Sequence, residues 1–271
     1  MEIEAPVWLD EEHPNYERWK RARRLSHHRG LFVKSILLQN RECKNLNILD
    51  IGSGEGGTAA VLSKNNFVVS IDLSSARLKN QSKKYSHFSL VNGDALHLPF
   101  KKNYFDLIIL QDVIEHTADP HKLILEAERV LNSRGVIYLS TPNKNSIINF
   151  LSDPHWGLPI VSILNRENIK YFFLRFFRKK DHSRSDTAQL LSLNDILKIS
   201  GNFHSSLNTK FSVQELLNKN EGIIWSRFHL RLIGLIKIFR LENLLLKIAN
   251  NNPGIINNYF TPTFYIMLKK K

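Results

Sequence analysis

Residues 48–57 read ILDIGSGEGG, an apolar run that contains one acid and ends in a stretch with four glycines. The apolar run is typical of a buried strand, and the glycines are typical of a tight turn from that strand into a helix. Such a turn lets a ligand approach the backbone closely, because glycine has no Cβ. Open α/β sheets hold nucleotide-like ligands at this point. The stretch therefore predicts the first strand of such a sheet and the place where a ligand binds.

Strand-like and helix-like patterns alternate beyond this stretch. We expect strands at 47–51, 67–72, 88–91, 105–111 and 136–140, a turn at Arg134-Gly135, and helices at 58–64, 74–84 and 121–131. Two more strand-like runs follow at 203–211 and 259–268, and Pro262 restricts the last one to an edge position or to the start of the strand. The alternation predicts an α/β, doubly wound, mainly parallel seven-stranded sheet.

Composition and pattern divide the chain into four parts. Residues 1–45 are expected to form an N-terminal helical cap, and residues 46–143 the ligand-binding core. Residues 144–189 lose the strand pattern and form an insert rich in aromatic and basic side chains. Residues 190–271 complete the sheet, with a helix capped by Ser192 and a second, helical insert at about 213–256.

Three acids stand at or near the ends of three successive strands. Asp50 lies inside the first strand, Asp72 closes the second, and Asp94 follows the third. A carboxylate at these places can contact, in turn, a cationic amino group, two ribose hydroxyls and an adenine amine. Together the acids outline an adenosine that carries a positive charge.

The glycines alone fit two cofactors equally well. Gly52, Gly54 and Gly57 match the G-x-G-x-x-G pattern of folds that bind NAD, and Asp72 stands where such folds place a ribose-binding acid. Asp50 inside the strand and the pair Asp94-Ala95 favour S-adenosylmethionine over NAD. An NAD-dependent oxidoreductase is therefore the disfavoured reading.

The segment from about 46 to 143 resembles the class I S-adenosylmethionine-dependent methyltransferases. ILDIGSGEGG looks like their first motif, VVSIDLSSARL at 68–78 like the second, and NGDALHLPFKKNYFDLIIL at 92–110 like the third and fourth. DVIEHTADP at 112–120 and VLNSRGVIYLSTPN at 130–143 are most similar to the branch that contains ubiquinone and menaquinone methyltransferases and many glycan and small-molecule enzymes.

The resemblance implies a role for each matching residue. The methionine end of the cofactor would lie against Asp50, Gly52, Ser53 and Gly54. The ribose and one face of the adenine would lie against Asp72 and Leu73, and the edge of the adenine against Asp94 and Ala95. Gln111 would close over the cofactor. The alternative for each acid alone is that it caps a turn or a helix start. A methyltransferase-like protein without catalysis is disfavoured because the glycines and acids are all present.

The segment Asp112-Val113-Ile114-Glu115-His116 follows the fourth strand at the carboxyl edge of the sheet. Histidine changes charge near neutral pH, so His116, with Glu115, is the candidate base for a hydroxyl acceptor. Alternatively, Glu115 and His116 support the loop by hydrogen bonding. A third possibility is a hard metal ion held by Asp112, Glu115 and His116, which share one helical face.

Two missing motifs narrow the acceptor. Enzymes that methylate exocyclic amines tend to carry Asn/Asp/Ser-Pro-Pro-Tyr/Phe after the fourth strand, where this chain reads Gln111-Asp112-Val113-Ile114. Methylation at cytosine C5 needs a nucleophilic cysteine near that edge, but the single cysteine, Cys43, precedes the first strand. We therefore expect methylation of an oxygen, less readily a carbon, of a small-molecule or lipid-linked acceptor of quinone or glycan type.

The chain is strongly basic, with a formal net charge of +13. Basic residues gather at 18–29, at 175–184 (with Lys179, Lys180 and Arg184), at 227–240 and at 269–271. Such clusters suit a phosphate, a nucleic acid or an anionic membrane. An RNA methyltransferase that uses this basic surface is the alternative function.

The helical insert combines basic and apolar residues on several sides. Trp225, Phe228, Leu232, Leu235, Ile236 and Phe239 are expected to share one helical face. Such a helix can lie at an anionic membrane surface, or it can pack as a lid or a subunit contact. The acidic first residues do not resemble a signal peptide, no stretch is long and apolar enough to span a bilayer, and the lone cysteine suits a reducing compartment. We expect a cytoplasmic protein, with membrane association as an open alternative.

Overall fold

The computed structural model describes residues 10–178, 181, 187–224 and 226–271. Lys179, Lys180 and Arg184 of the second basic cluster, and Trp225 of the expected helical face, lie outside the described residues. Among the helices that are described, none combines the length and the apolar character needed to cross a membrane.

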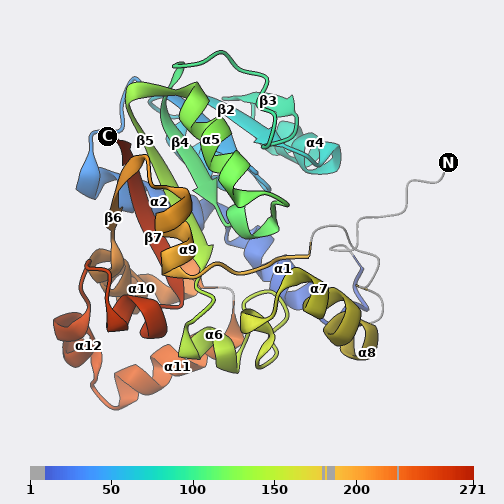
Figure 1. Ribbon diagram of the computed structural model, residues 1–271, viewed down its shortest axis with the longest axis vertical. Helices are drawn as coiled ribbons and strands as arrows, with labels where there is room; N and C mark the ends of the chain where they lie inside the picture. Colours follow the sequence, from blue (N-terminus) through green and yellow to red (C-terminus); the bar gives the residue numbers. More distant parts are fainter. Residues whose placement is uncertain (1–9, 179–180, 182–186, 225) are drawn as a thin grey trace.

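A seven-stranded sheet in the order β3-β2-β1-β4-β5-β7-β6 forms the centre of the molecule (Figure 1). Its strands are β1 Asn47–Ile51, β2 Phe67–Asp72, β3 Ser89–Asn92, β4 Phe105–Gln111, β5 Leu131–Pro142, β6 Phe203–Leu207 and β7 Thr263–Lys270. The first five pair in parallel, and β7 runs antiparallel to both of its neighbours, β5 and β6. The predicted doubly wound, mainly parallel sheet is confirmed.

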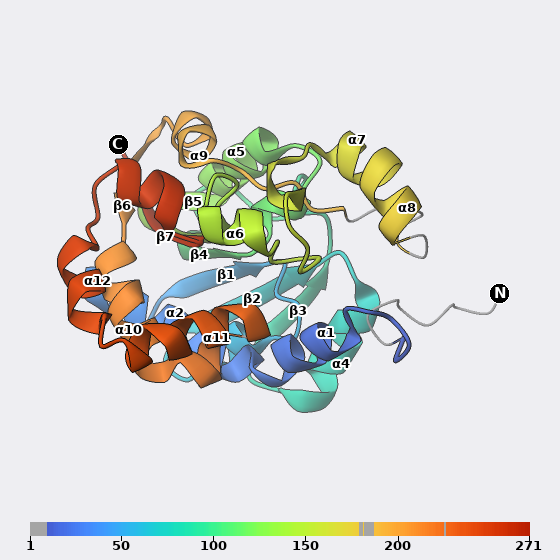
Figure 2. The ribbon, with the colours of Figure 1, turned by 90° about the horizontal axis from the view of Figure 1, so that it is seen from below.

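Helices cover both faces of the sheet, as Figure 2 shows from below. The helices that build these layers are α1 Tyr16–Arg24, α2 Ser26–Asn40, α3 Gly57–Leu62, α4 Ser75–Lys84, α5 Pro120–Val130 and α9 Leu193–Ile199. Apolar side chains of α5 and α9 pack on one face, and those of α2 and α3 pack on the other. The strands between them are buried on both faces, which is why β4 reads as a continuous apolar run.

Two inserts lie at the lower end of the sheet in Figure 1. The first insert contains α6 Ile147–Leu151, η3 Val161–Ile163, α7 Arg166–Asn168, η4 Ile169–Leu174 and α8 Arg175–Phe177. The second insert contains α10 Thr209–Ile223, α11 Arg227–Ile238, α12 Glu242–Ile248 and η6 Ile256–Phe260. The remaining short element, η2 Ile114–His116, follows β4.

The predicted end of β6 and the predicted start of β7 are wrong. β6 ends at Leu207, because α10 begins at Thr209; β7 begins only at Thr263, after Pro262. Residues 256–260 are helical instead, held by the side chain of Asn143, which donates to the carbonyls of Asn257 (3.2 Å) and Asn258 (2.9 Å).

The predicted turn at Arg134-Gly135 is also wrong, because these residues lie inside β5. Phe105 of β4 pairs with Leu131 of β5, but Leu107 pairs with Val136, so the register between the two strands shifts. The additional residues of β5, which include Arg134 and Gly135, form an irregularity within the strand instead of a turn. The expected capping of α9 is confirmed, with a full capping box between Ser192 and Asp195.

Candidate active site

The glycine loop after β1 has the left-handed backbone that its sequence suggests. Gly52 and Gly54 have φ values of +65° and +54°. A Cβ on Gly52 would lie 2.6 Å from Val113 Cγ2, so a side chain there would collide with the segment that follows β4. The glycine loop thus lies directly against the segment 112–116, which follows β4.

Asp50 is almost completely buried in β1 beneath this loop, with 2% of its surface exposed. Burial, and next the charge of Asp72, raise the pKa of its carboxyl group to about 7. Its Oδ2 atom has no hydrogen-bond partner among the described residues. A buried carboxylate oxygen that lacks a partner fits a cationic ligand group, which would stabilise its charged form.

Asp72 ends β2 and braces the loop from the side. Its Oδ2 accepts a hydrogen bond from the backbone N–H of Gly54 (2.9 Å), and its Oδ1 accepts one from Ser74 (2.8 Å). Each carboxylate oxygen can accept a second bond, which leaves one acceptor position on each for a ribose hydroxyl. The predicted ribose contact is compatible with this arrangement and stays a prediction.

The other predicted contacts of the adenosine lie farther out. Leu73 is 76% exposed, Asp94 accepts a bond from the backbone of Leu96 (2.9 Å), and Ala95 packs against the core. Gln111, at the end of β4, accepts a hydrogen bond from the Thr58 hydroxyl (2.7 Å). The capping role considered for Asp94 is therefore present in the structure, and its contact with adenine stays a prediction.

A cavity of about 280 Å³ opens beside the loop. Five of the predicted cofactor residues line it, whereas Asp72, Leu73, Asp94 and Ala95 do not: the lining includes Asp50, Gly52, Ser53, Gly54 and Gln111. Asp112, Glu115 and His116 line the same cavity. The structure therefore brings the expected methionine end of the cofactor and the expected catalytic segment into one space.

Helix α1 and the first insert form another wall of this cavity. Arg18 donates from Nη1 to the backbone carbonyls of Asp153 (3.1 Å) and Pro154 (2.6 Å), so the helix and the insert are joined. His155 and Trp156 follow directly and line the cavity. The N-terminal helix α1 and the aromatic and basic insert therefore both contribute to its walls.

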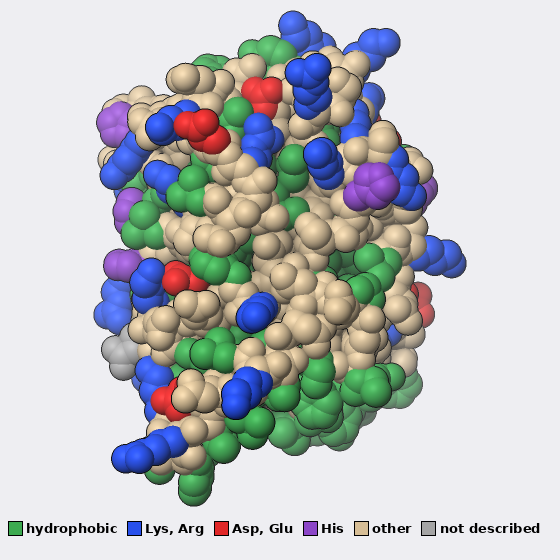
Figure 3. All heavy atoms as spheres, turned by 90° about the vertical axis from the view of Figure 1, so that its left-hand side faces the viewer, with side chains coloured by type: hydrophobic (Ala, Val, Ile, Leu, Met, Phe, Trp, Pro, Cys, Tyr) green, Lys and Arg blue, Asp and Glu red, His purple; other side chains and the backbone are tan. Residues whose placement is uncertain are grey.

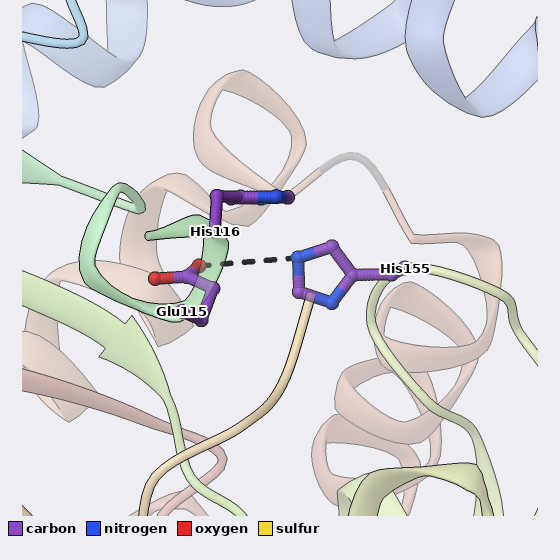
Figure 4. Close-up of side chains that lie close together, drawn as sticks. All are labelled: Glu115, His116 and His155. Carbon is purple, nitrogen blue, oxygen red and sulfur yellow. Dashed lines mark ion pairs between the residues drawn. The ribbon is translucent and has the colours of Figure 1, made fainter. Parts of the chain in front are cut away.

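Glu115, His116 and His155 converge in the cavity, as Figure 4 shows. Glu115 Oε1 lies 3.9 Å from His155 Nε2, and the two imidazole rings are 5.0 Å apart at an angle of 80°. The Thr141 hydroxyl donates to Glu115 Oε2 (2.9 Å). Burial, and next the charge of Asp112, raise the pKa of the Glu115 carboxyl group to about 8.

Asp112 does not belong to this cluster, so the structure does not bring together the three residues considered as ligands of a metal ion. The backbone of Asp112 is left-handed, with a φ of +54°. Its carboxylate forms an ion pair with Arg29 and accepts a hydrogen bond from the Ser140 hydroxyl (3.0 Å). Among the described residues, His155 takes its place: the ligand atoms of Glu115, His116 and His155 lie within 4.8 Å of one another.

Residues 49–139 match a family model described as a methyltransferase domain. The chain contains a class I S-adenosylmethionine-dependent methyltransferase domain. The whole sheet resembles that of an S-adenosylmethionine-dependent methyltransferase from Thermotoga maritima, with a TM-score of 0.54, 17% identity and 95% of each chain covered. The cofactor of this domain is S-adenosylmethionine, and the buried Asp50 and the glycine loop fit it.

Two curated relatives have names that refer to quinones. A demethylmenaquinone methyltransferase of Lactiplantibacillus plantarum is 30% identical over 128 residues, 44% of this chain. A ubiquinone biosynthesis O-methyltransferase of Bartonella quintana is 27% identical over 161 residues, 57% of this chain. This chain spans only 54% and 59% of the lengths of these two relatives.

Several residues of the methyltransferase site had no signal in the sequence. His155 lies in the insert, far from Glu115 in sequence, and reaches it only through the fold. Arg166 fixes the insert to the catalytic segment, donating to the backbone carbonyl of Thr117 (2.8 Å). Arg29 belongs to a basic cluster that we read as a surface for partners, yet it pairs with Asp112 inside the site.

Proposed function

We propose that this methyltransferase methylates an oxygen of a small-molecule or lipid-linked acceptor of quinone or glycan type. The observation that carries the proposal is that Asp50 and the cluster Glu115, His116 and His155 line one cavity of about 280 Å³. The buried carboxyl group of Asp50 can bind a cationic group of the cofactor, and the cluster can remove a proton from the acceptor. The names of the two quinone-pathway relatives support the acceptor class.

When bound, S-adenosylmethionine would supply an electrophilic methyl group: the acceptor oxygen bonds to the methyl carbon, the carbon–sulfur bond breaks, S-adenosylhomocysteine leaves, and the hydroxyl proton passes to the protein. The ionised Asp50 would hold the cationic end of the cofactor. His116 is positioned to take the proton, and His155 is positioned to accept it in turn. Glu115, whose pKa is about 8, can orient His116 in its protonated form and can accept a proton only in its ionised form. The walls from α1 and the insert limit the access of water to this space.

The same cluster offers a second way to activate a hydroxyl. Two imidazoles and one carboxylate are a ligand set that zinc accepts in open catalytic sites. Ligands about 2.1 Å from one metal ion lie at most about 4.2 Å apart, so side chains now within 4.8 Å would have to draw together slightly. Activity that disappears with a chelator and returns with one divalent metal would favour this mechanism, and activity that survives the chelator would favour the base.

The first experiment concerns the cofactor. Calorimetric titration of the purified protein should show binding of S-adenosylhomocysteine and none of NADH. The matched variants are Asp50→Asn, which we expect to lose most of the affinity, and the exposed helix cap Asp119→Asn, which we expect to retain it. Binding of NADH without binding of S-adenosylhomocysteine would refute the proposal.

The second experiment concerns the acceptor. The protein is incubated with S-adenosylmethionine and separate extracts of lipids, glycans and RNA, and mass spectrometry is used to find products that have gained one CH₂ group. We expect the product among the lipids or glycans, at an oxygen. A product found only in the RNA fraction would replace this proposal by the RNA methyltransferase.

A further inference from the structure

A second cavity, of about 260 Å³, lies beneath the helical insert. Its walls come from α10, α11, α12 and η6 and from β7, and they are mainly apolar, as with Leu217, Ile233 and Ala249. Protein interiors are close-packed and contain few voids larger than a water molecule. Its volume lies just below the range of roughly 300–1,000 Å³ that pockets for small molecules span, so the cavity can hold part of a ligand such as a length of hydrocarbon chain.

One end of this apolar cavity meets the active site. Arg29, Gln111 and Asp112 line both cavities, as do Pro142 and Pro154. The hydroxyl of Ser212, which faces the apolar cavity, donates to the carbonyl of Asn208 (2.7 Å) and is therefore satisfied within its own helix. A molecule that fills the apolar cavity would thus present its end at Gln111 and Asp112, beside the cofactor loop.

The other end reaches an exposed apolar surface. Ile248 and Phe260 line the cavity and are still 44% and 51% exposed. The surface continues over the second insert through further exposed side chains: Leu235, Ile238, Phe239, Leu241, Leu244, Ile255 and Tyr259. Figure 3 shows hydrophobic side chains gathered at the lower end of the molecule on this side. We call these nine residues the apolar surface.

Basic residues stand among this apolar surface. Arg231, Lys237 and Arg240 on and after α11, and Lys247 on α12, are all exposed. An apolar surface with interleaved cations complements an anionic lipid bilayer, which accepts apolar side chains and attracts positive charge. The predicted single face of this insert is wrong in detail, because Leu232 and Ile236 line the cavity while Leu235 and Phe239 face outward.

One polar atom inside the cavity lacks a partner. Nδ1 of His229 is buried and has no hydrogen-bond partner among the described residues. Burial, and next the charge of Arg18, lower the pKa of this histidine to about 4, so the ring is neutral. A neutral imidazole can serve one polar group along a chain that is otherwise hydrocarbon.

We propose that the apolar cavity binds the hydrocarbon chain of a lipid acceptor, which enters from the membrane at the apolar surface and ends at the active site. The proposal rests on the proposed function, because the chain places an acceptor oxygen beside Gln111 and Asp112. The continuity of the cavity with both the active site and the apolar surface selects this occupant over a protein segment.

The test is direct binding of a fluorescent polyene fatty alcohol, measured without cofactor or acceptor. Ile148→Trp fills the cavity from α6, and Ile236→Trp fills it from α11. The control is Ile147→Trp, which changes the same residue type on the same helix but is 47% exposed and does not line the cavity. Binding of S-adenosylhomocysteine, measured on every protein, reports whether the core is folded.

We expect the unmodified protein and Ile147→Trp to bind the probe with equal affinity. Each excluded methylene costs about fourfold in affinity, so displacing three methylenes should weaken binding by about 60-fold in the two filling variants. Absence of probe binding, equal binding by all four proteins, or an equal loss in Ile147→Trp would overturn the proposal. Failure of the unmodified protein to bind S-adenosylhomocysteine would refute the proposed function. Binding of the probe would still show separately whether the apolar cavity holds a hydrocarbon chain.

Discussion

Replacement of Asp50 by asparagine tests the central claim about the cofactor loop, because it should strengthen the fold and weaken the function. The pKa of this buried carboxyl is raised from 3.8 to about 7. A carboxyl whose pKa is higher in the folded than in the unfolded protein takes up protons on folding, so stability is lost as pH rises from about 4 to about 7. At pH 8 this loss amounts to about 4 kcal/mol, at about 1.4 kcal/mol per pKa unit.

Asparagine removes that loss but adds a buried amide group. The N–H group of Ala59, which bonds to the Asp50 carboxyl, can bond to the amide oxygen instead. The amide NH₂ then stands where Oδ2 now lacks a partner, at a cost of about 1–3 kcal/mol. Asp50→Asn should therefore stabilise the ligand-free protein at pH 8 by about 1–3 kcal/mol, and should destabilise it at pH 4.

Urea unfolding at pH 4 and at pH 8 measures this difference. A variant whose stability relative to the unmodified protein is the same at both pH values would refute the reasoning, because the asparagine has no charge to titrate. Asp119→Asn, at an exposed helix cap, is the control and should show no gain at pH 8.

The same pKa predicts how cofactor binding depends on pH. A cationic ligand binds the ionised Asp50, and the ionised fraction is about one tenth at pH 6 and about nine tenths at pH 8 for a pKa of about 7. S-adenosylhomocysteine, whose methionine end carries an ammonium group, should therefore bind about tenfold more weakly at pH 6, by calorimetry. Asp50→Asn should bind weakly at both pH values, and a tenfold dependence that survives in this variant would contradict the assignment.

Three further changes test other parts of the structure. Glu115→Gln should lower kcat about 10²- to 10⁴-fold if Glu115 takes part in proton removal, while calorimetry shows unchanged binding of S-adenosylhomocysteine; an unchanged kcat would leave Glu115 a structural role. Gly52→Ala should abolish this binding, since its Cβ would lie 2.6 Å from Val113 Cγ2, and wild-type affinity would contradict the loop geometry. The protein should co-sediment with anionic liposomes at low salt, and Phe239→Glu together with Leu244→Glu should abolish this; sedimentation that persists in the double variant would place membrane contact elsewhere.

The sequence predicts what depends on neighbours along the chain. The apolar run of β4 and the capping box at Ser192 are local patterns, and both appear in the structure as expected. The cofactor loop is also local, since its glycines and Asp50 lie within ten residues of one another. The start of β7 is partly local, because Pro262 allows only a strand start or an edge position there. The bonds from Asn143 that hold the helical residues 256–260 come from more than a hundred residues away in sequence, so no local pattern reveals that helix.

The cluster of Glu115, His116 and His155 was predicted only in the part that is continuous in sequence. Glu115 and His116 are adjacent, whereas His155 is delivered by an insert that Arg166 and Arg18 fasten in place. A lone histidine in a loop carries no signal of its own. Asp112 was misassigned for a related reason: helical spacing placed it with Glu115, but its left-handed backbone and Arg29 turn it to other partners.

The position of Arg29 shows that the positive charge of the chain does not all lie on a surface for partners. Arg29 and Asp112 pair where the two cavities meet, and both side chains are about four-fifths shielded from water. The charge of Asp112 raises the pKa of Glu115, and the charge of Arg29 lowers it. Part of the basic cluster at 18–29 therefore serves the site itself: Arg18 joins α1 to the insert, and Arg29 offsets the charge of an acid beside the catalytic cluster. For this reason, the net charge supports a nucleic-acid partner less strongly than the sequence alone suggests.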